Sequence, residues 1–359
     1  ALVARGASMI EYWHWHTLHS GAETYWGGVL PHSQRPGRVY SEVAELGALL
    51  AGLGDRLDGF VPDADVAILY STDSKQSFED FPPLCNPDGS PRATAYHDIV
   101  DAFHAAVVHG GAQARIVHAE QWDDLEAAEA ARSFPILVAA AFYVATTAQL
   151  EKLRDYAAAG GHLVLGPRTG YGDEESRARL AVAPDVVGPA AGVHYEEFTS
   201  LRAPLPVVGD AMTVSAGASG RWWADHLIVD DAETLAHYRH PQIGRFPAVT
   251  TRAHGRGRVT YVGTVPDRAL GADLVRHLVP APLAGAWRRD DPVTVLSGVA
   301  NGTRIHFLHN WSGGAAHATT PHAVDDLIAG VPLPGGHRLT LDPWGCLVLA
   351  DNHPAPETH

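Results

Sequence analysis

The chain has 359 residues, of which 46% are hydrophobic and 19% charged, a composition that fits two or three soluble globular domains. Its formal net charge of -15 argues against nucleic acid or an anionic membrane as a partner. The sequence shows no apolar span long enough for a membrane helix and no signal peptide. The two cysteines, Cys85 and Cys346, lie far apart and form no metal spacing and no disulfide framework. They predict a reducing, cytoplasmic compartment, and we expect no metal and no other cofactor.

The densest group of aromatic, histidine and carboxylate residues lies near the start of the chain. Residues 9–16 read Met-Ile-Glu-Tyr-Trp-His-Trp-His, and their period of two predicts a β-strand. One face of that strand carries Glu11, Trp13 and Trp15. Because a carboxylate is costly to bury without a partner, we expect this face to line a polar site.

A glycine-rich loop, residues 21–28, follows the predicted strand and reads Gly-Ala-Glu-Thr-Tyr-Trp-Gly-Gly. An apolar stripe from Val39 to Leu53 then predicts an amphipathic helix that ends near Gly54 or Gly59. The order strand, loop, helix is one unit of a (β/α)8 barrel, in which the loops at the carboxyl ends of strands carry the active site. A single unit cannot fold alone, because its strand has no partners for its backbone hydrogen bonds.

Two other interpretations of this stretch stay open. The aromatic residues could be ordinary core. His14 and His16 share a strand face, and with His19 nearby they could bind a metal ion, although the 22 histidines scattered through the chain make a chance cluster the simpler explanation.

Residues 9–16 with residues 21–30 resemble the eighth strand and following loop of family 42 glycoside hydrolases, the bacterial β-galactosidases. Residues 38–46 resemble the last helix of that barrel. The resemblance runs to the C-terminus and covers about the second half of the family's polypeptide. It implies a retaining mechanism with two catalytic glutamates, both of which would precede residue 1, so no catalytic residue is expected in this chain.

The resemblance also implies a sugar subsite. Glu23 matches a glutamate that hydrogen-bonds galactose hydroxyls, and Trp13 matches an aromatic position lining the same subsite. Trp26 falls where relatives vary, and Glu11 is a further substrate-binding candidate. Neither Glu11 nor Glu23 matches a catalytic glutamate. Carboxylates that bridge hydroxyls and aromatic faces against C–H patches are how proteins hold sugars.

Residues 62–287 alternate strands and helices, which predicts a parallel sheet covered on both faces. The expected elements are strands at 65–70, 113–117, 134–139 and 162–166, helices at 96–109 and 146–159, two later strands at 247–250 and 257–264, and a closing helix from 271. This region resembles the class I glutamine amidotransferase-like domain. Its counterpart in family 42 is a trimerisation domain, which implies a homotrimer, with a domain that packs only within its own chain as the alternative.

An amidase using a Cys–His pair is an alternative function of a different class. It needs a cysteine on a strand-to-helix elbow. The strand that should present it ends in residues 138–143, which contain neither Cys nor Ser, and Cys85 lies in a proline-rich loop. Residues 163–174 hint at a phosphate loop, but they lack its Gly-Lys-Ser/Thr ending, so we expect a sharp strand-end turn.

Residues 288–359 predict a small antiparallel β domain. Asn301-Gly302 joins two strand-like runs, and Asn-Gly is a strong hairpin pattern. The segments 307–311 and 343–345 resemble the C-terminal domain of family 42, which we expect to be a structural cap rather than a sugar-binding module. The tail, residues 352–359, is expected to be frayed.

The sequence therefore predicts the end of a barrel at 1–61, an amidotransferase-like α/β domain at 62–287 and a β domain at 288–359. The predicted function is a portion of a retaining β-galactosidase that acts on galactosides. The alternative is a non-catalytic oligomerisation module with a β cap and no turnover of its own.

Overall fold

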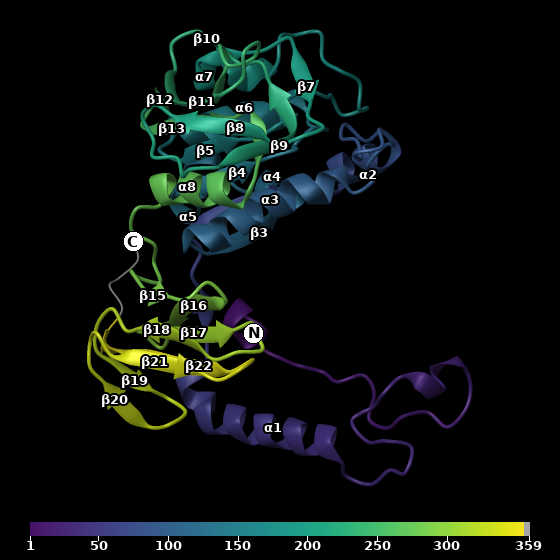
Figure 1. Ribbon diagram of the computed structural model, residues 1–359, viewed down its shortest axis with the longest axis vertical. Helices are drawn as coiled ribbons and strands as arrows, with labels where there is room; N and C mark the ends of the chain where they lie inside the picture. The colour runs from purple at the N-terminus through teal and green to yellow at the C-terminus, as the bar shows by residue number, and fades with distance from the viewer. Residues whose placement is uncertain (355–359) are drawn as a thin grey trace. The chain divides into compact units, whose positions relative to one another are not determined.

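The computed structural model of the protein describes residues 1–354 (Figure 1). The chain divides into two compact units. The first comprises Ala1–Asp63 together with the chain from Ala284 onward, and the second is Ala64–Leu283. Within the described part of the chain, no helix combines the length and the apolar composition needed to cross a lipid bilayer.

The second unit is built on one mixed sheet of eleven strands. These are β2 (Val66–Tyr70), β3 (Ala114–His118), β4 (Ile136–Ala139), β5 (His162–Leu165), β7 (Phe198–Ser200), β8 (Leu205–Gly209), β9 (Ser219–Asp225), β11 (Glu233–Tyr238), β12 (Pro247–His254), β13 (Gly257–Val262) and β14 (Thr264–Pro266). The strands β3, β2, β4, β5 and β13 are parallel neighbours in that order. Beyond β13 every pairing is antiparallel, so the predicted parallel sheet is one half of a mixed sheet. A separate short pair joins β6 (Val193–His194) to β10 (Ile228–Val229).

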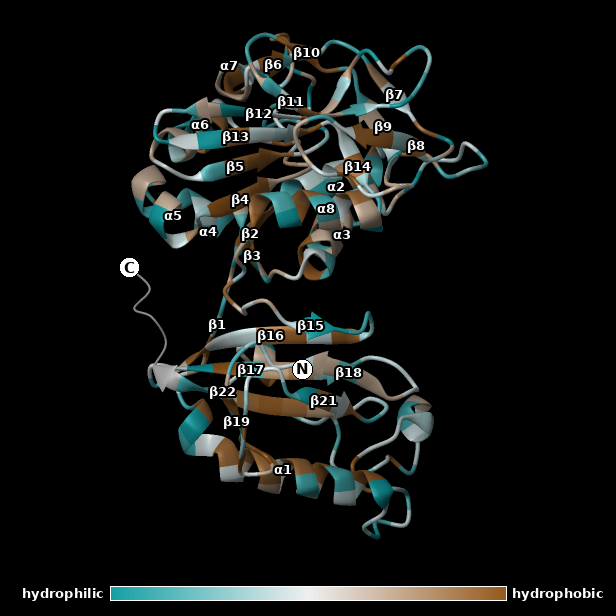
Figure 2. Cartoon of the chain, turned by 60° about the vertical axis from the view of Figure 1, so that its left-hand side comes forward, coloured by the Kyte–Doolittle hydropathy of each residue, from teal (hydrophilic) through white to brown (hydrophobic). Residues whose placement is uncertain are grey.

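Helices cover both faces of the parallel half, as the strand–helix alternation predicts. They are α2 (Thr72–Asp80), α3 (Ala95–Gly110), α4 (Ala119–Asp123), α5 (Ala127–Ser133), α6 (Thr147–Ala158), α7 (Gly188–Ala191) and α8 (Arg268–Leu278), with a 3-10 turn, η3 (Asp185–Val187). Along β2, Val66 and Ile68 pack in one core with α3 and α8. Ala67 and Leu69 pack in the opposite core with α5 and α6. Figure 2 shows β4 and β5 in hydrophobic colours, as expected of strands buried on both faces.

The first unit contains two antiparallel sheets. Its elements are η1 (Val3–Arg5), η2 (Ala22–Tyr25), α1 (Arg38–Leu57), β1 (Val61–Pro62), β15 (Arg288–Arg289), β16 (Val293–Ala300), β17 (Thr303–Asn310), β18 (Ala316–Thr319), β19 (Val324–Asp326), β20 (Val331–Leu333), β21 (Arg338–Leu341) and β22 (Cys346–Pro354). One sheet has the order β1-β16-β17-β22-β19-β20 and the other β15-β18-β21. Asn301 and Gly302 both have positive φ, 50° and 74°, and close the β16–β17 hairpin, so that prediction is confirmed.

The predicted end of the first helix is confirmed, because α1 passes Gly54 and stops at Leu57, just before the left-handed Gly59 (φ 66°). The predicted fraying from Asn352 needs correction, because residues 352–354 extend β22, which pairs with β17. Residues 355–359 lie outside the described part of the chain.

The start of the chain and the β domain share a hydrophobic core. Ala4 and Leu53 are buried in the same cluster as Phe307 from β17. Strand β1 pairs with β16, and a Cβ atom added at Gly298 would lie only 2.3 Å from the carbonyl oxygen of Val61. The close approach of these two backbones therefore depends on a glycine at position 298.

Candidate functional site

Residues 9–16, predicted as a strand, form none. Their only β pairing is an isolated parallel bridge between His16 and Leu30. A strand is stabilised by ladder hydrogen bonds to neighbours, and among the described residues no neighbouring strand flanks this segment. The residues of this segment do alternate with a period of two, but the segment lacks the neighbouring strands that would make it a β-strand.

The segment instead closes a loop on itself. The Val29 and Leu30 amides donate to the carbonyl oxygens of His14 and Trp15, at 2.9 and 2.8 Å. The Thr17 hydroxyl accepts from the Gly28 amide at 3.0 Å and donates to the Leu30 carbonyl at 3.1 Å. A Cβ atom at Gly28 would lie 2.6 Å from the backbone of His16, so only glycine allows this approach. The closed loop carries the turn η2 at its tip.

Two of the predicted aromatic residues meet through a histidine. The rings of Trp13 and His14 stack at 5.8 Å with an interplanar angle of 4°. The Nε2 atom of His14 lies 3.4 Å from the carbonyl oxygen of Trp26. Trp13 is 79% exposed and Trp26 is 60% exposed, so a large part of each indole is open to solvent. The alternation placed Trp13 and His14 on opposite faces, which is wrong without a strand, and the role of His14 between the two tryptophans was therefore missed.

The two carboxylates lie in different surroundings. Glu23 is half-buried within η2, and its carbonyl oxygen accepts from the Trp26 amide at 3.0 Å. Glu11 is exposed in irregular chain. Among residues 1–354, neither side chain forms a hydrogen bond or an ion pair with another residue. Both carboxylates can therefore accept hydrogen bonds from hydroxyl groups outside the chain.

A hollow of about 500 Å³ lies between residues 3–12 and α1. Met9, Tyr12, Leu46 and Leu50 contribute to its lining. Leu46 is 39% exposed, whereas Leu53, further along the same stripe, is only 4% exposed. The apolar stripe of α1 is therefore covered at its carboxyl end and open in its middle.

The second unit holds the remaining positions that the sequence singled out. After β4 the chain turns through Ala141, whose φ is 56°, so this strained strand-end turn carries an alanine rather than a nucleophile. Cys85 is an exposed free thiol in a loop bridged to Pro91. After β5, Arg168 (φ 66°) makes a tight turn with its guanidinium 3.7 Å from the Tyr171 ring centre, which fits a strand-end turn.

Two family models match this chain, one over each of two consecutive regions. The family described as "Beta-galactosidase trimerisation domain" matches residues 64–282, and the family described as "Beta-galactosidase" matches residues 1–53. "Beta-galactosidase BgaB" of a Geobacillus species is 30% identical over 268 residues, covering 74% of this chain and 37% of that protein. The structure of the β-galactosidase of Halorubrum lacusprofundi has a TM-score of 0.76 at 27% identity and covers 95% of this chain and 47% of that one. That of Bacillus circulans sp. alkalophilus has a TM-score of 0.84 at 23% identity, covers 97% and 50%, and shows the shared fold.

These matches place the chain in a glycoside hydrolase family. The trimerisation-domain match alone spans more than half of the chain, and the chain belongs to the family 42 β-galactosidases. It spans less than half of the length of the Geobacillus protein and corresponds to a C-terminal portion of the family's architecture.

Proposed function

We propose that this chain is a portion of a retaining β-galactosidase that hydrolyses terminal β-D-galactosyl residues of galactosides. The observation that carries the proposal is the consecutive match of residues 1–53 and 64–282 to two regions of one enzyme family. The catalytic glutamates belong to the part of the relatives that the chain does not span. Within this chain, the loop around η2 supplies sugar recognition and the second unit supplies oligomerisation.

In the proposed subsite, Glu23 and Glu11 accept hydrogen bonds from sugar hydroxyls, and Trp13 and Trp26 pack against the C–H faces of the ring. The free carboxylates and the exposed indoles support these roles, because a sugar can reach both kinds of group. His14 holds the two tryptophans in place, since its ring stacks on Trp13 and contacts the Trp26 backbone.

The finer assignments are part of the same proposal. Residues 1–61 end the catalytic barrel, residues 62–287 are a trimerisation domain of amidotransferase-like fold, and residues 288–359 are a β cap. The five parallel strands and the strained turn at Ala141 support that fold, and the alanine there argues against an amidase. A homotrimer and a cytoplasmic location complete the proposal, the latter resting on the free thiols of Cys85 and Cys346.

An activity assay tests the division of labour. The 359-residue chain alone should not hydrolyse a chromogenic β-galactoside, because the retaining reaction needs two carboxyl groups about 5–5.5 Å apart that act as acid/base and nucleophile. Turnover by this chain that disappears on Glu11→Gln or Glu23→Gln would contradict the proposal.

A second assay tests the subsite in the polypeptide that includes the rest of the barrel. Glu23→Gln should lower kcat/KM about 10- to 100-fold, the value of a hydrogen bond to a charged group. Glu45→Gln, on the exposed surface of α1, is the matched control and should leave kcat/KM unchanged. If both variants behave like the wild type, Glu23 does not bind the sugar. If no galactoside is hydrolysed by the longer polypeptide either, the non-catalytic alternative holds.

Sedimentation tests the assembly. We expect the chain to sediment as a trimer at micromolar concentration. A monomer at all concentrations would refute the trimer without affecting the assignment of the subsite.

A further inference from the structure

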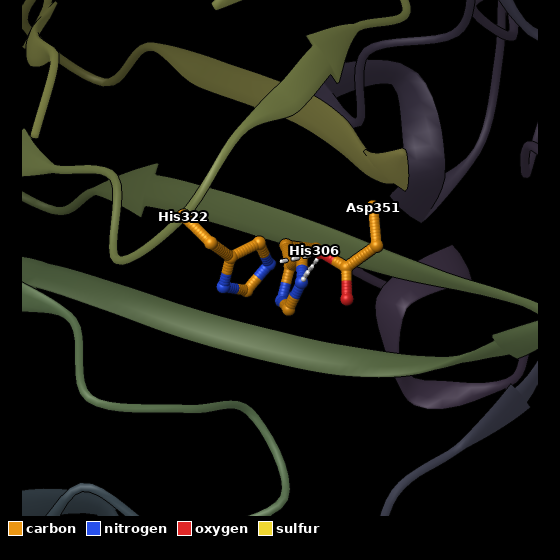
Figure 3. Close-up of side chains that lie close together, drawn as sticks. All are labelled: His306, His322 and Asp351. Atoms are coloured by element: carbon orange, nitrogen blue, oxygen red, sulfur yellow. Dashed lines mark hydrogen bonds and ion pairs between the residues drawn. The ribbon is translucent and has the colours of Figure 1, made fainter. Parts of the chain in front are cut away.

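Three metal-ligating side chains converge in the β domain, far in sequence from the candidate subsite. His306 comes from β17, Asp351 from β22, and His322 from the loop between β18 and β19 (Figure 3). The Nε2 atoms of His306 and His322 lie 2.9 and 2.6 Å from the same oxygen, Oδ1 of Asp351. One ligand atom from each of the three residues lies within 4.8 Å of the other two.

Strand register explains why these residues meet. His306 is paired with Leu349 across β17 and β22, so Asp351, two residues further on, projects from the same face of the sheet. On the other side of β22, Val324 of β19 is paired with Asp351. His322 precedes Val324 by two residues and so approaches the same face.

One histidine of the site is buried and the other is partly exposed to solvent. The side chain of His306 is fully buried, and its ring packs edge-on against Trp287 at 5.3 Å. Its Nδ1 atom has no hydrogen-bond partner among the described residues, so the polar interactions of this ring are directed through Nε2 toward Asp351. The side chain of His322 is 46% exposed, which gives an ion a path from solvent.

We propose that His306, His322 and Asp351 bind one divalent transition-metal ion, for which Zn²⁺ is the natural occupant. Imidazole nitrogens favour Zn²⁺ and its neighbours in the first transition row over Mg²⁺ and Ca²⁺, which prefer oxygen ligands. Zn²⁺ binds imidazole at about 2.0–2.1 Å and carboxylate at about 2.0–2.2 Å. The two nitrogen atoms need to move only slightly away from Oδ1 of Asp351 to make room for the ion, and the exposed loop at His322 can supply that movement.

The ion would act as a structural staple. It ties the loop before β19 to β17 and β22, which otherwise hold His322 through a single hydrogen bond to Asp351. A water molecule on the solvent side of His322 would complete a tetrahedral set. The sequence predicts no metal here, and residues 306, 322 and 351 show none of the short spacings by which zinc sites are recognised.

Calorimetry on the full chain tests the proposal. After treatment with EDTA and dialysis, the protein is titrated with Zn²⁺, and His322→Ala and Asp351→Asn are titrated in parallel. His322 is half exposed and Asn keeps the shape of Asp, so neither variant should unfold. His337→Ala, an exposed histidine of the same domain, is the matched control. We expect one saturable Zn²⁺ site in the wild type and in His337→Ala that is absent from the other two variants.

Two further measurements separate this site from the histidines near the N-terminus. Zn²⁺ at about 100 times its Kd should raise the Tm of the first unit by roughly 9 °C in the wild type and not in His322→Ala. Co²⁺ in place of Zn²⁺ should give the intense visible bands of a four-coordinate complex. The proposal is overturned if His322→Ala binds Zn²⁺ like the wild type, or if binding is lost only when His14, His16 and His19 are replaced.

Discussion

We expect Asp225 to make the second unit less stable as the pH rises. It ends β9 with its side chain fully buried. The Trp223 indole donates to Oδ1 at 2.8 Å, and the Tyr261 hydroxyl donates to Oδ2 at 3.0 Å. Burial raises the pKa of Asp225 to about 7, against the opposing effect of these two hydrogen bonds and of the positive charge of Arg168.

The size of the effect follows from the pKa. The rise from 3.8 to about 7 corresponds to about 4 kcal/mol, since each pKa unit is worth about 1.4 kcal/mol. Because the folded pKa is the higher one, the folded state holds the proton more tightly. The associated stability is fully present below pH 3.8 and is lost as the pH rises through 7. Between pH 5 and pH 8 the loss is about 3 kcal/mol.

The substitution Asp225→Asn removes the titrating carboxyl group and keeps the shape of the side chain. The amide can still accept from Trp223, and the Tyr261 hydroxyl can turn to accept from its NH2 group. Urea unfolding of the full chain at several pH values, followed by tryptophan fluorescence, measures the free energy of unfolding. The wild type should lose about 3 kcal/mol relative to Asp225→Asn between pH 5 and pH 8. Asp101→Asn, on the exposed face of α3, is the control and should track the wild type. Parallel pH profiles for the wild type and Asp225→Asn would refute the reasoning.

Two further substitutions test the first unit. Gly298→Ala should cost about 1–3 kcal/mol and speed hydrogen exchange in β1, because the new Cβ meets the Val61 carbonyl, whereas Gly313→Ala, where a Cβ meets nothing within 4 Å, should have little effect on thermal unfolding. Equal effects of the two changes would mean that β1 does not depend on this contact. His309→Phe should raise the free energy of unfolding by about 1–3 kcal/mol at pH 7, because neither ring nitrogen of this buried histidine finds a partner among the described residues. Burial, and then the positive charges of the N-terminal amine and Arg5, lower the pKa of His309 to about 4, so its titration costs the folded state nothing above pH 6.5 and destabilises it increasingly as the pH falls from 6.5 through 4. The advantage of Phe should therefore grow in acid, and an advantage that stays constant from pH 7 to pH 4 would show that His309 does not titrate in this way.

Local patterns in the sequence determined most of the α/β unit and the hairpin. The run at β2 is apolar on both faces, and Thr146 and Gln149 cap α6 reciprocally, so strand and helix follow from neighbouring residues alone. Asn301-Gly302 fixes its turn because both residues tolerate positive φ. The order of these strands in the sheet does not follow from local patterns, and only the tertiary structure revealed the antiparallel half beyond β13.

The opening stretch shows the limit of such patterns. The sequence determined which side chains are gathered there, and the resemblance gave them a role. Whether residues 9–16 form a strand depends on ladder partners that lie outside the segment, so the tertiary structure decided that they form a closed loop, with His14 between Trp13 and Trp26. The cluster of His306, His322 and Asp351 was decided in the same way, because strand register joins residues that no local spacing connects.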